Sequence, residues 1–144
     1  MSELQFWHHH GGVSVPDLEA AVAWYSEVLG FKVEGRFHIP TIPADVAMMV
    51  NGDLRMELFE VPGAAPLPED RRIPDSDLHT HGNKHISFLV RDIDSFADEL
   101  RRRGADIVWV KKFDHGANIF IRDNGGNLIE FVQETPPTGR PASL

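Results

Sequence analysis

The stretch that decides the fold is Lys84-His85-Ile86-Ser87-Phe88-Leu89-Val90-Arg91-Asp92-Ile93. Its alternating apolar residues predict a half-buried strand, and Asp92 is a typical residue at the start of a helix. A stretch near the N-terminus, His10-Gly11-Gly12-Val13-Ser14-Val15-Pro16-Asp17-Leu18, has the same order. In both, an Asp follows the His by seven residues, and the third and fifth residues after the His are apolar. The chain therefore contains one strand-to-helix pattern twice, and each copy begins with a potential metal ligand.

The spacing of matching residues extends this repeat over most of the chain. The separations are 75 residues for His10 and His85, 75 for Asp17 and Asp92, 74 for Gly30 and Gly104, and 73 for Glu57 and Glu130. A drift of two residues, taken up in loops, is typical of a duplicated unit. The sequence therefore predicts an α+β fold of two tandem β-α-β-β-β modules that form a curved mixed sheet.

Turn and breaker residues set the expected boundaries within one overall domain. The first module is predicted at 1–61, a connector or lid at 62–83, the second module at 84–134 and a tail at 135–144. Four prolines and Gly63 in the connector favour irregular structure there. Apolar periodicity predicts helices after Asp17 and from Ile93 to Arg103. It predicts the remaining strands near 31–37, 46–50, 54–61, 107–110, 119–122 and 128–132.

Composition limits the kind of partner and the compartment. The formal net charge is −8, so a nucleic-acid partner is not expected and a small-molecule substrate is favoured. The chain has no cysteine, which excludes disulfides and thiolate metal ligands. No apolar run is long enough for a membrane span, and the N-terminus does not resemble a secretory signal. We therefore expect a cytoplasmic protein without a membrane partner.

Each predicted module has one His on its first strand and one Glu on its last strand. The apolar neighbours of Glu130 alternate away from it, so His10, Glu57, His85 and Glu130 are expected on the face opposite the helices. An unpaired carboxylate in the apolar run around Glu130 would be costly. Two imidazoles and two carboxylates suit an octahedral divalent ion with open positions for substrate. Glu60 is the alternative to Glu57 if a β-bulge shifts the register.

Several motifs resemble the glyoxalase / bleomycin resistance / dioxygenase (vicinal oxygen chelate) superfamily. They are His10…Val15-Pro-Asp17-Leu18…Trp24-Tyr25…Leu29-Gly30-Phe31, His85…Val90-Arg-Asp92-Ile93…Gly104, and Arg122-Asp123…Gly126-Asn127-Leu128-Ile129-Glu130-Phe131. The resemblance covers roughly residues 6–134. It implies that the curved sheet surrounds one divalent metal (Ni, Co, Zn, Mn or Fe). It also implies that His10, Glu57, His85 and Glu130 are its ligands and that neighbouring substrate oxygens chelate it.

The second ligand position separates the branches that this resemblance suggests. Members similar to glyoxalase I have Glu there, methylmalonyl-CoA epimerases have Gln, and extradiol dioxygenases and fosfomycin thiol transferases do not use the position. Glu57 therefore favours a metal-dependent lyase or isomerase acting on an α-hydroxy carbonyl-like substrate, with Glu130 or Glu57 as the catalytic base.

Two alternative functions remain at this stage. One is an extradiol-type dioxygenase with a His/His/Glu site and Fe(II) or Mn(II), in which Glu57 would not bind metal. The other is a resistance protein that sequesters a ligand without turnover. A homodimer is expected in either case, and the site can be built within one chain or across a two-fold axis.

Overall fold

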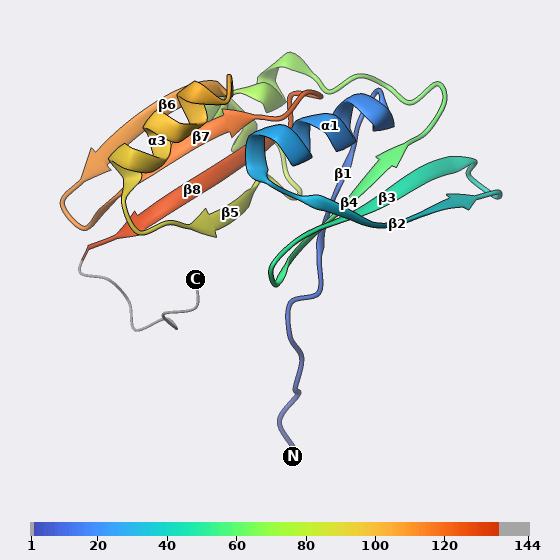
Figure 1. Ribbon diagram of the computed structural model, residues 1–144, viewed down its shortest axis with the longest axis horizontal. Helices are drawn as coiled ribbons and strands as arrows, with labels where there is room; N and C mark the ends of the chain where they lie inside the picture. The colour runs from blue at the N-terminus through green and yellow to red at the C-terminus, as the bar shows by residue number, and fades with distance from the viewer. Residues whose placement is uncertain (1, 136–144) are drawn as a thin grey trace.

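The computed structural model describes residues 2–135 and shows two four-stranded sheets, each packed against one long helix (Figure 1). In chain order the first module comprises β1 (Gly11–Ser14), α1 (Leu18–Leu29), β2 (Lys32–Ile39), β3 (Ala44–Asn51) and β4 (Leu54–Glu60). The second comprises β5 (Ile86–Leu89), α3 (Ile93–Arg102), β6 (Asp106–Phe113), β7 (Gly116–Arg122) and β8 (Leu128–Glu134).

The two sheets have the same topology. Their strand orders are β1-β4-β3-β2 and β5-β8-β7-β6. In each sheet the first strand pairs in parallel with the last, and the other pairs are antiparallel. This arrangement confirms the predicted fold of tandem β-α-β-β-β modules.

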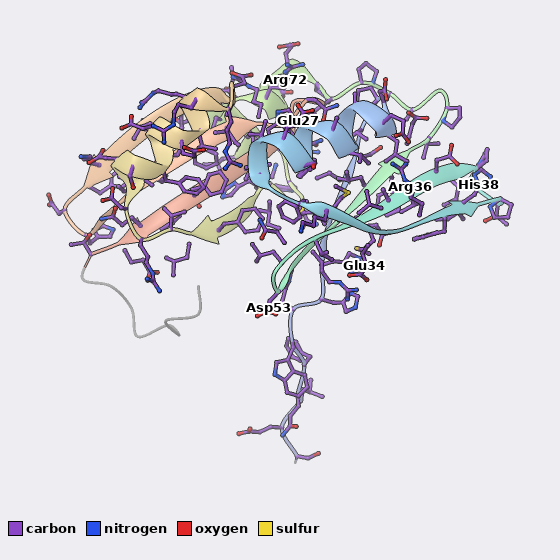
Figure 2. All side chains as sticks on the ribbon, in the orientation of Figure 1. Glu27, Glu34, Arg36, His38, Asp53 and Arg72 are labelled. Atoms are coloured by element: carbon purple, nitrogen blue, oxygen red, sulfur yellow. The ribbon has the colours of Figure 1, made fainter. Side chains whose placement is uncertain are left out.

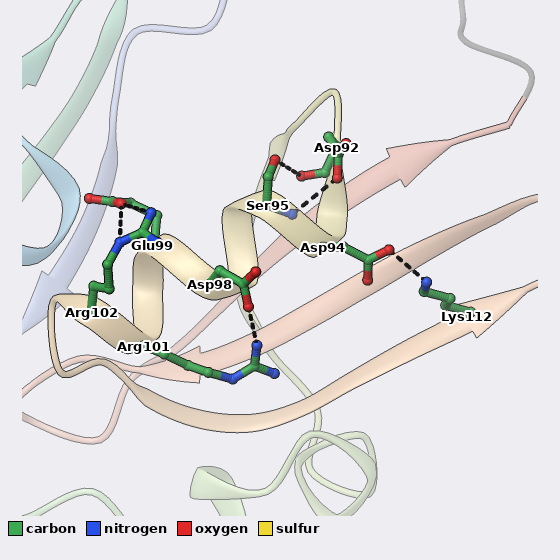
Figure 3. Close-up of polar contacts among 8 residues, drawn as sticks. All are labelled: Asp92, Asp94, Ser95, Asp98, Glu99, Arg101, Arg102 and Lys112. Carbon is green, nitrogen blue, oxygen red and sulfur yellow. Dashed lines mark hydrogen bonds and ion pairs between the residues drawn. The ribbon is translucent and has the colours of Figure 1, made fainter.

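Local sequence signals define where both long helices begin and where α1 ends. The Asp17 carboxylate accepts a hydrogen bond from the Ala20 backbone N at 3.0 Å, and Gly30 ends α1 with φ of 73°. The Asp92 carboxylate caps α3 in the same way by accepting from Ser95 N at 3.1 Å (Figure 3). The equivalent caps of the two helices repeat the sequence spacing in three dimensions.

The connector is more regular than the sequence suggests. It contains a 3₁₀ turn, η1 (Glu69–Arg72), and a one-turn helix, α2 (Pro74–Asp77), so the prediction of irregular structure throughout 62–83 is wrong at these two places. Pro74 is compatible with α2 because the first N–H of a helix needs no partner within the helix. Within residues 2–135 no helix is long and apolar enough to cross a membrane. Residues 136–144, almost all of the predicted tail, lie outside the described part.

Both modules contribute to a single hydrophobic core. The cluster includes residues of α1 and α3 and the apolar faces of both sheets, among them Leu18, Tyr25, Met56, Leu58, Leu100, Ile119, Ile129 and Phe131. The first strands of the two modules also meet, because a Cβ added to Gly11 would lie only 2.9 Å from Ile86 Cδ1. The modules therefore pack against each other through their apolar, helix-bearing faces.

A buried hydrogen bond links the modules within this core. The Tyr25 hydroxyl on α1 donates to Asp123 Oδ2 in the β7–β8 turn at 2.8 Å. The backbone N atoms of Gly125 and Asn127 donate to the other oxygen of Asp123, both at 2.9 Å. Burial raises the pKa of Asp123 above its ordinary value, although the hydrogen bonds from Tyr25 and its neighbours oppose that shift. Burial also raises the pKa of Tyr25 well above its ordinary value, so Tyr25 remains the donor.

We expect Tyr25→Phe to lower the free energy of unfolding by about 2 kcal/mol at pH 7, because a buried carboxylate loses a donor. The raised folded pKa means that Asp123 destabilises the fold progressively as the pH rises from about 4 through that pKa. Losing the donor raises the pKa of Asp123 further, so the substitution should cost less at pH 4 than at pH 7. Urea unfolding at the two pH values measures both effects, and equal losses would contradict this account.

Candidate metal centre

The first His–Glu pair lies on the first sheet. His10 immediately precedes β1, and Glu57 lies on β4 opposite Gly12 in the parallel register. The distance between His10 Nε2 and Glu57 Oε2 is 3.0 Å. The ring of His9 packs edge-on against His10 with the ring centroids 4.9 Å apart. The parallel pairing of β1 and β4 therefore brings together two of the four predicted ligands.

The second pair occupies the equivalent place on the second sheet. His85 immediately precedes β5, and Glu130 lies on β8 opposite Ser87. His85 Nε2 lies 3.6 Å from Glu130 Oε1, and the ring of Phe120 packs edge-on against His85 at 4.9 Å. The sequence repeat is thus also a repeat of site geometry.

Three further residues, which the sequence patterns did not indicate, form hydrogen bonds around Glu130. Ser87 Oγ donates to Glu130 Oε1 at 2.8 Å, and Asn118 Nδ2 donates to Glu130 Oε2 at 3.0 Å. Trp109 Nε1 in turn donates to Asn118 Oδ1 at 3.1 Å. The alternation of side chains along the strand places Ser87 on the same face as His85. Asn118 and Trp109 can be placed beside Glu130 only once the pairing of β6, β7 and β8 is known.

Glu60 has a different task from Glu57. Its Oε1 accepts a hydrogen bond from the backbone N of Leu18 at 2.7 Å, which satisfies one of the free N–H groups at the start of α1. Glu60 therefore serves the helix, whereas Glu57 is the carboxylate that contacts His10.

Histidines outside the two pairs lie on the surface. His38, on the edge strand β2, contacts Asp45 Oδ1 at 2.7 Å and projects outward beside Arg36 (Figure 2). His79 and His81 on the connector are exposed, as is His115 in the β6–β7 turn.

The two pairs are not brought together in one chain. Glu57 lies between Met56 and Leu58, and Glu130 between Ile129 and Phe131, and these four neighbours all belong to the shared core. Both glutamates therefore lie on the sheet faces that point away from this core. Across residues 2–135 no three His, Cys, Asp or Glu side chains are close enough to hold a metal ion. One chain thus holds two separate His–Glu pairs, each called a half-site below.

A buried ion-pair cluster holds the connector next to the second half-site. Asp77 is only 1% exposed, and its Oδ1 contacts Arg71 Nε at 3.0 Å and Lys84 Nζ at 3.2 Å. Lys84 directly precedes His85, so this cluster ties the connector to the start of β5. A hollow of about 1330 Å³ lies between the connector and strands β1 and β5, with Arg72 and His85 among its lining residues. Arg72 projects from the connector in Figure 2.

Comparison with known proteins agrees with this architecture. Residues 7–131 match the family model described as Glyoxalase/Bleomycin resistance protein/Dioxygenase superfamily. A domain of that description from Frankia sp. EAN1pec has a TM-score of 0.74 and 25% sequence identity, with 95% of this chain and 96% of that chain covered. The chain therefore belongs to the glyoxalase/bleomycin resistance protein/dioxygenase superfamily.

Two relatives have named activities. The human mitochondrial methylmalonyl-CoA epimerase is 29% identical, with 87% of this chain and 72% of that protein covered. The lactoylglutathione lyase of Pseudomonas putida is 28% identical, with 92% of this chain and 87% of that protein covered. An epimerase and a lyase are thus among the proteins that this chain resembles.

We expect Asp77→Asn to lower the free energy of unfolding by about 2–3 kcal/mol, because it leaves Arg71 and Lys84 without their buried counter-charge. Asp75→Asn is the matched control, since Asp75 is an exposed acid on the same short helix. Its effect should stay within about 0.5 kcal/mol. Urea unfolding compares the two variants, and equal effects would show that the Asp77 cluster does not stabilise the connector.

Proposed function

We propose that this protein is a divalent-metal-dependent lyase or isomerase that moves a proton on the carbon next to a carbonyl group. Its substrate would be a small oxygenated compound of the α-hydroxy carbonyl type. The observation that carries the proposal is the repeated His–Glu pair, His10 with Glu57 and His85 with Glu130, at equivalent positions of two equivalent sheets.

The donor chemistry of the two pairs suits Ni, Co, Zn, Mn or Fe. Together they supply two imidazole nitrogens and two carboxylates, which leaves positions for substrate in an octahedral sphere. When bound, the ion would polarise the substrate oxygens and make the neighbouring C–H group more acidic. The chain's own task is to bring a carboxylate, Glu57 or Glu130, to that hydrogen as a general base.

The named relatives support proton transfer beside a carbonyl group. Methylmalonyl-CoA and lactoylglutathione, the compounds in their names, are both thioesters with a hydrogen on the carbon next to the carbonyl. Lactoylglutathione, which carries a hydroxyl group on that carbon, is therefore the first substrate to test, and methylmalonyl-CoA, which carries none there, is the second, in the cytoplasmic setting that the sequence favours.

A second copy of the chain would complete the site. The shared core directs the two half-sites away from each other, so His10 and Glu57 of one copy would meet the partner's His85 and the partner's Glu130 across a two-fold axis. Exposed apolar groups favour such an interface. Leu4, Phe6 and Trp7, on the arm that leads into β1, are 89%, 82% and 82% exposed (Figure 1). Phe37 on β2 is 49% exposed.

Mixed dimers test where the site is built. His10→Ala and His85→Ala homodimers should each lose tight metal binding, because every site lacks one ligand. When the two variants are mixed and allowed to exchange, a mixed dimer built across the two-fold axis contains one intact site and one doubly defective site. Metal content by elemental mass spectrometry should therefore recover, to about one ion per mixed dimer.

Native mass spectrometry confirms that subunits have exchanged in this experiment. A mixture of His10→Ala with Glu57→Ala is the matched control, because these ligands belong to the same half-site and no exchange can restore an intact site. No recovery in exchanged His10→Ala/His85→Ala dimers would show that the site lies within one chain.

Proton exchange tests the reaction itself. In D₂O the metal-loaded protein should introduce deuterium next to the carbonyl of lactoylglutathione or methylmalonyl-CoA, and a chelator should stop this exchange until metal is restored. Glu57→Ala should lower metal affinity about 10-fold or more, whereas Glu60→Ala should leave it unchanged and lower stability by about 1 kcal/mol. NMR and metal titration provide the two measurements.

Each alternative function predicts a different outcome. Metal fully retained in Glu57→Ala would favour a three-ligand site of the dioxygenase kind. A wild-type protein that takes up no metal, yet binds a ligand stoichiometrically without turnover, would favour sequestration.

A further inference from the structure

The two carboxylates of the proposed site are equally buried but differently held. The side chains of Glu57 and Glu130 are 15% and 16% exposed, so burial does not distinguish them. Hydrogen bonding does, because each oxygen of Glu130 accepts from a side chain, Oε1 from Ser87 and Oε2 from Asn118. Two donors from different strands restrict rotation of the Glu130 carboxylate.

Trp109 determines which way the Asn118 amide faces. An indole N–H can only donate, so the Asn118 atom 3.1 Å from Trp109 Nε1 must be the amide oxygen. The amide NH₂ group is therefore directed at Glu130, where it lies 3.0 Å from Oε2. The order Trp109, Asn118, Glu130 is a chain of hydrogen bonds with a single possible direction.

The first module has no counterpart of these donors. In the strand register Glu57 lies beside Gly12 and Met48, just as Glu130 lies beside Ser87 and Phe120. Gly12 therefore occupies the place of Ser87. By the same pairing, Val46 stands where the second module has Asn118, and Gly35 stands where it has Trp109. None of these three residues has a side-chain donor.

From this difference we infer that Asn118, oriented by Trp109 and assisted by Ser87, fixes Glu130 as a stationary metal ligand and leaves Glu57 as the carboxylate that moves. This inference rests on the proposed function and divides the work between its two glutamates. Asn118, Trp109 and Ser87 are positioning residues, and Glu57 is the base. Glu57 takes the proton from the carbon next to the carbonyl, the electron pair of the C–H bond moves into the carbonyl group, and the proton returns to a carbon of the product.

Metal affinity measures the positioning role without any substrate. Competition for Ni²⁺ with a chromophoric chelator, on the full-length protein, should show affinity about 10- to 100-fold weaker for Asn118→Ala. Trp109→Phe should weaken it less, and the double variant should be no weaker than Asn118→Ala alone, because both act through one chain of hydrogen bonds. Thermal melting of the metal-free variants verifies that each remains folded.

Two matched pairs separate positioning from general damage to the sheet. Ser87→Ala should lower Ni²⁺ affinity, whereas Ser87→Thr should retain most of it because the hydroxyl donor remains. Lys111→Gln is a control beside the hydrogen-bond chain from Trp109 to Glu130. Lys111 Nζ lies 3.5 Å from the centroid of the Trp109 ring but does not bond to Asn118 or Glu130. Lys111→Gln should stay within about twofold of the wild type.

The outcomes separate this inference from the proposed function. Wild-type protein that binds no Ni²⁺ overturns the proposed function and the inference with it. Wild-type binding that Asn118→Ala leaves unchanged overturns the inference alone. Deuterium exchange into lactoylglutathione then tests the division of work: Glu57→Gln should abolish it, and Glu130→Gln should slow it but leave it measurable. Exchange retained in Glu57→Gln would overturn the assignment of the base.

Discussion

The shared hydrophobic core between the two modules is the constraint on which the rest of the structure depends. Both sheets turn their apolar faces inward, toward α1, α3 and each other, and the Tyr25–Asp123 hydrogen bond joins the modules inside that core. Because side chains alternate along a strand, the residues between the core positions must face outward. Glu57 and Glu130 are such residues. The packing that stabilises one chain therefore also keeps the two His–Glu pairs of that chain apart.

Duplication explains why the two half-sites match, and later divergence explains why they differ. Equivalent strand pairings place a His beside a Glu in each module. In the second module the Glu accepts from two further side chains, Ser87 and Asn118, whose equivalent positions in the first module are Gly12 and Val46. A symmetric metal site needs no such difference. A site that transfers a proton does need this difference, because a permanent metal ligand requires a fixed carboxylate whereas a base requires a carboxylate that can move.

Much of the fold could be predicted from the sequence because it depends on local signals. Asp17 and Asp92 cap the helices as expected, and alternation around Glu130 correctly places it opposite the core. The relative position of the modules could not be predicted, since equal apolar patterns allow them to pack in more than one way. Asn118 escaped notice for a similar reason. The partners of an Asn in an apolar strand are known only when the neighbouring strands and their register are known. The β-bulge between Ile107 and Trp109 shifts the register of β6 against β7. The turns of the connector were also not predicted, because the burial of Asp77 between Arg71 and Lys84, six and seven residues away, depends on how the segment folds back on itself.

A half-site of two donors has a consequence for regulation under the proposed arrangement. One imidazole and one carboxylate bind a divalent ion weakly, whereas four donors held rigidly bind it tightly. Assembly of two copies and capture of the metal would therefore stabilise each other, since a ligand that binds only the assembled form shifts the equilibrium toward it. The exposed arm that carries Leu4, Phe6 and Trp7 leads directly into His10. Ordering this arm against a partner would thus fix the very segment that supplies the first ligand, and it would couple the apolar interface to the geometry of the metal centre.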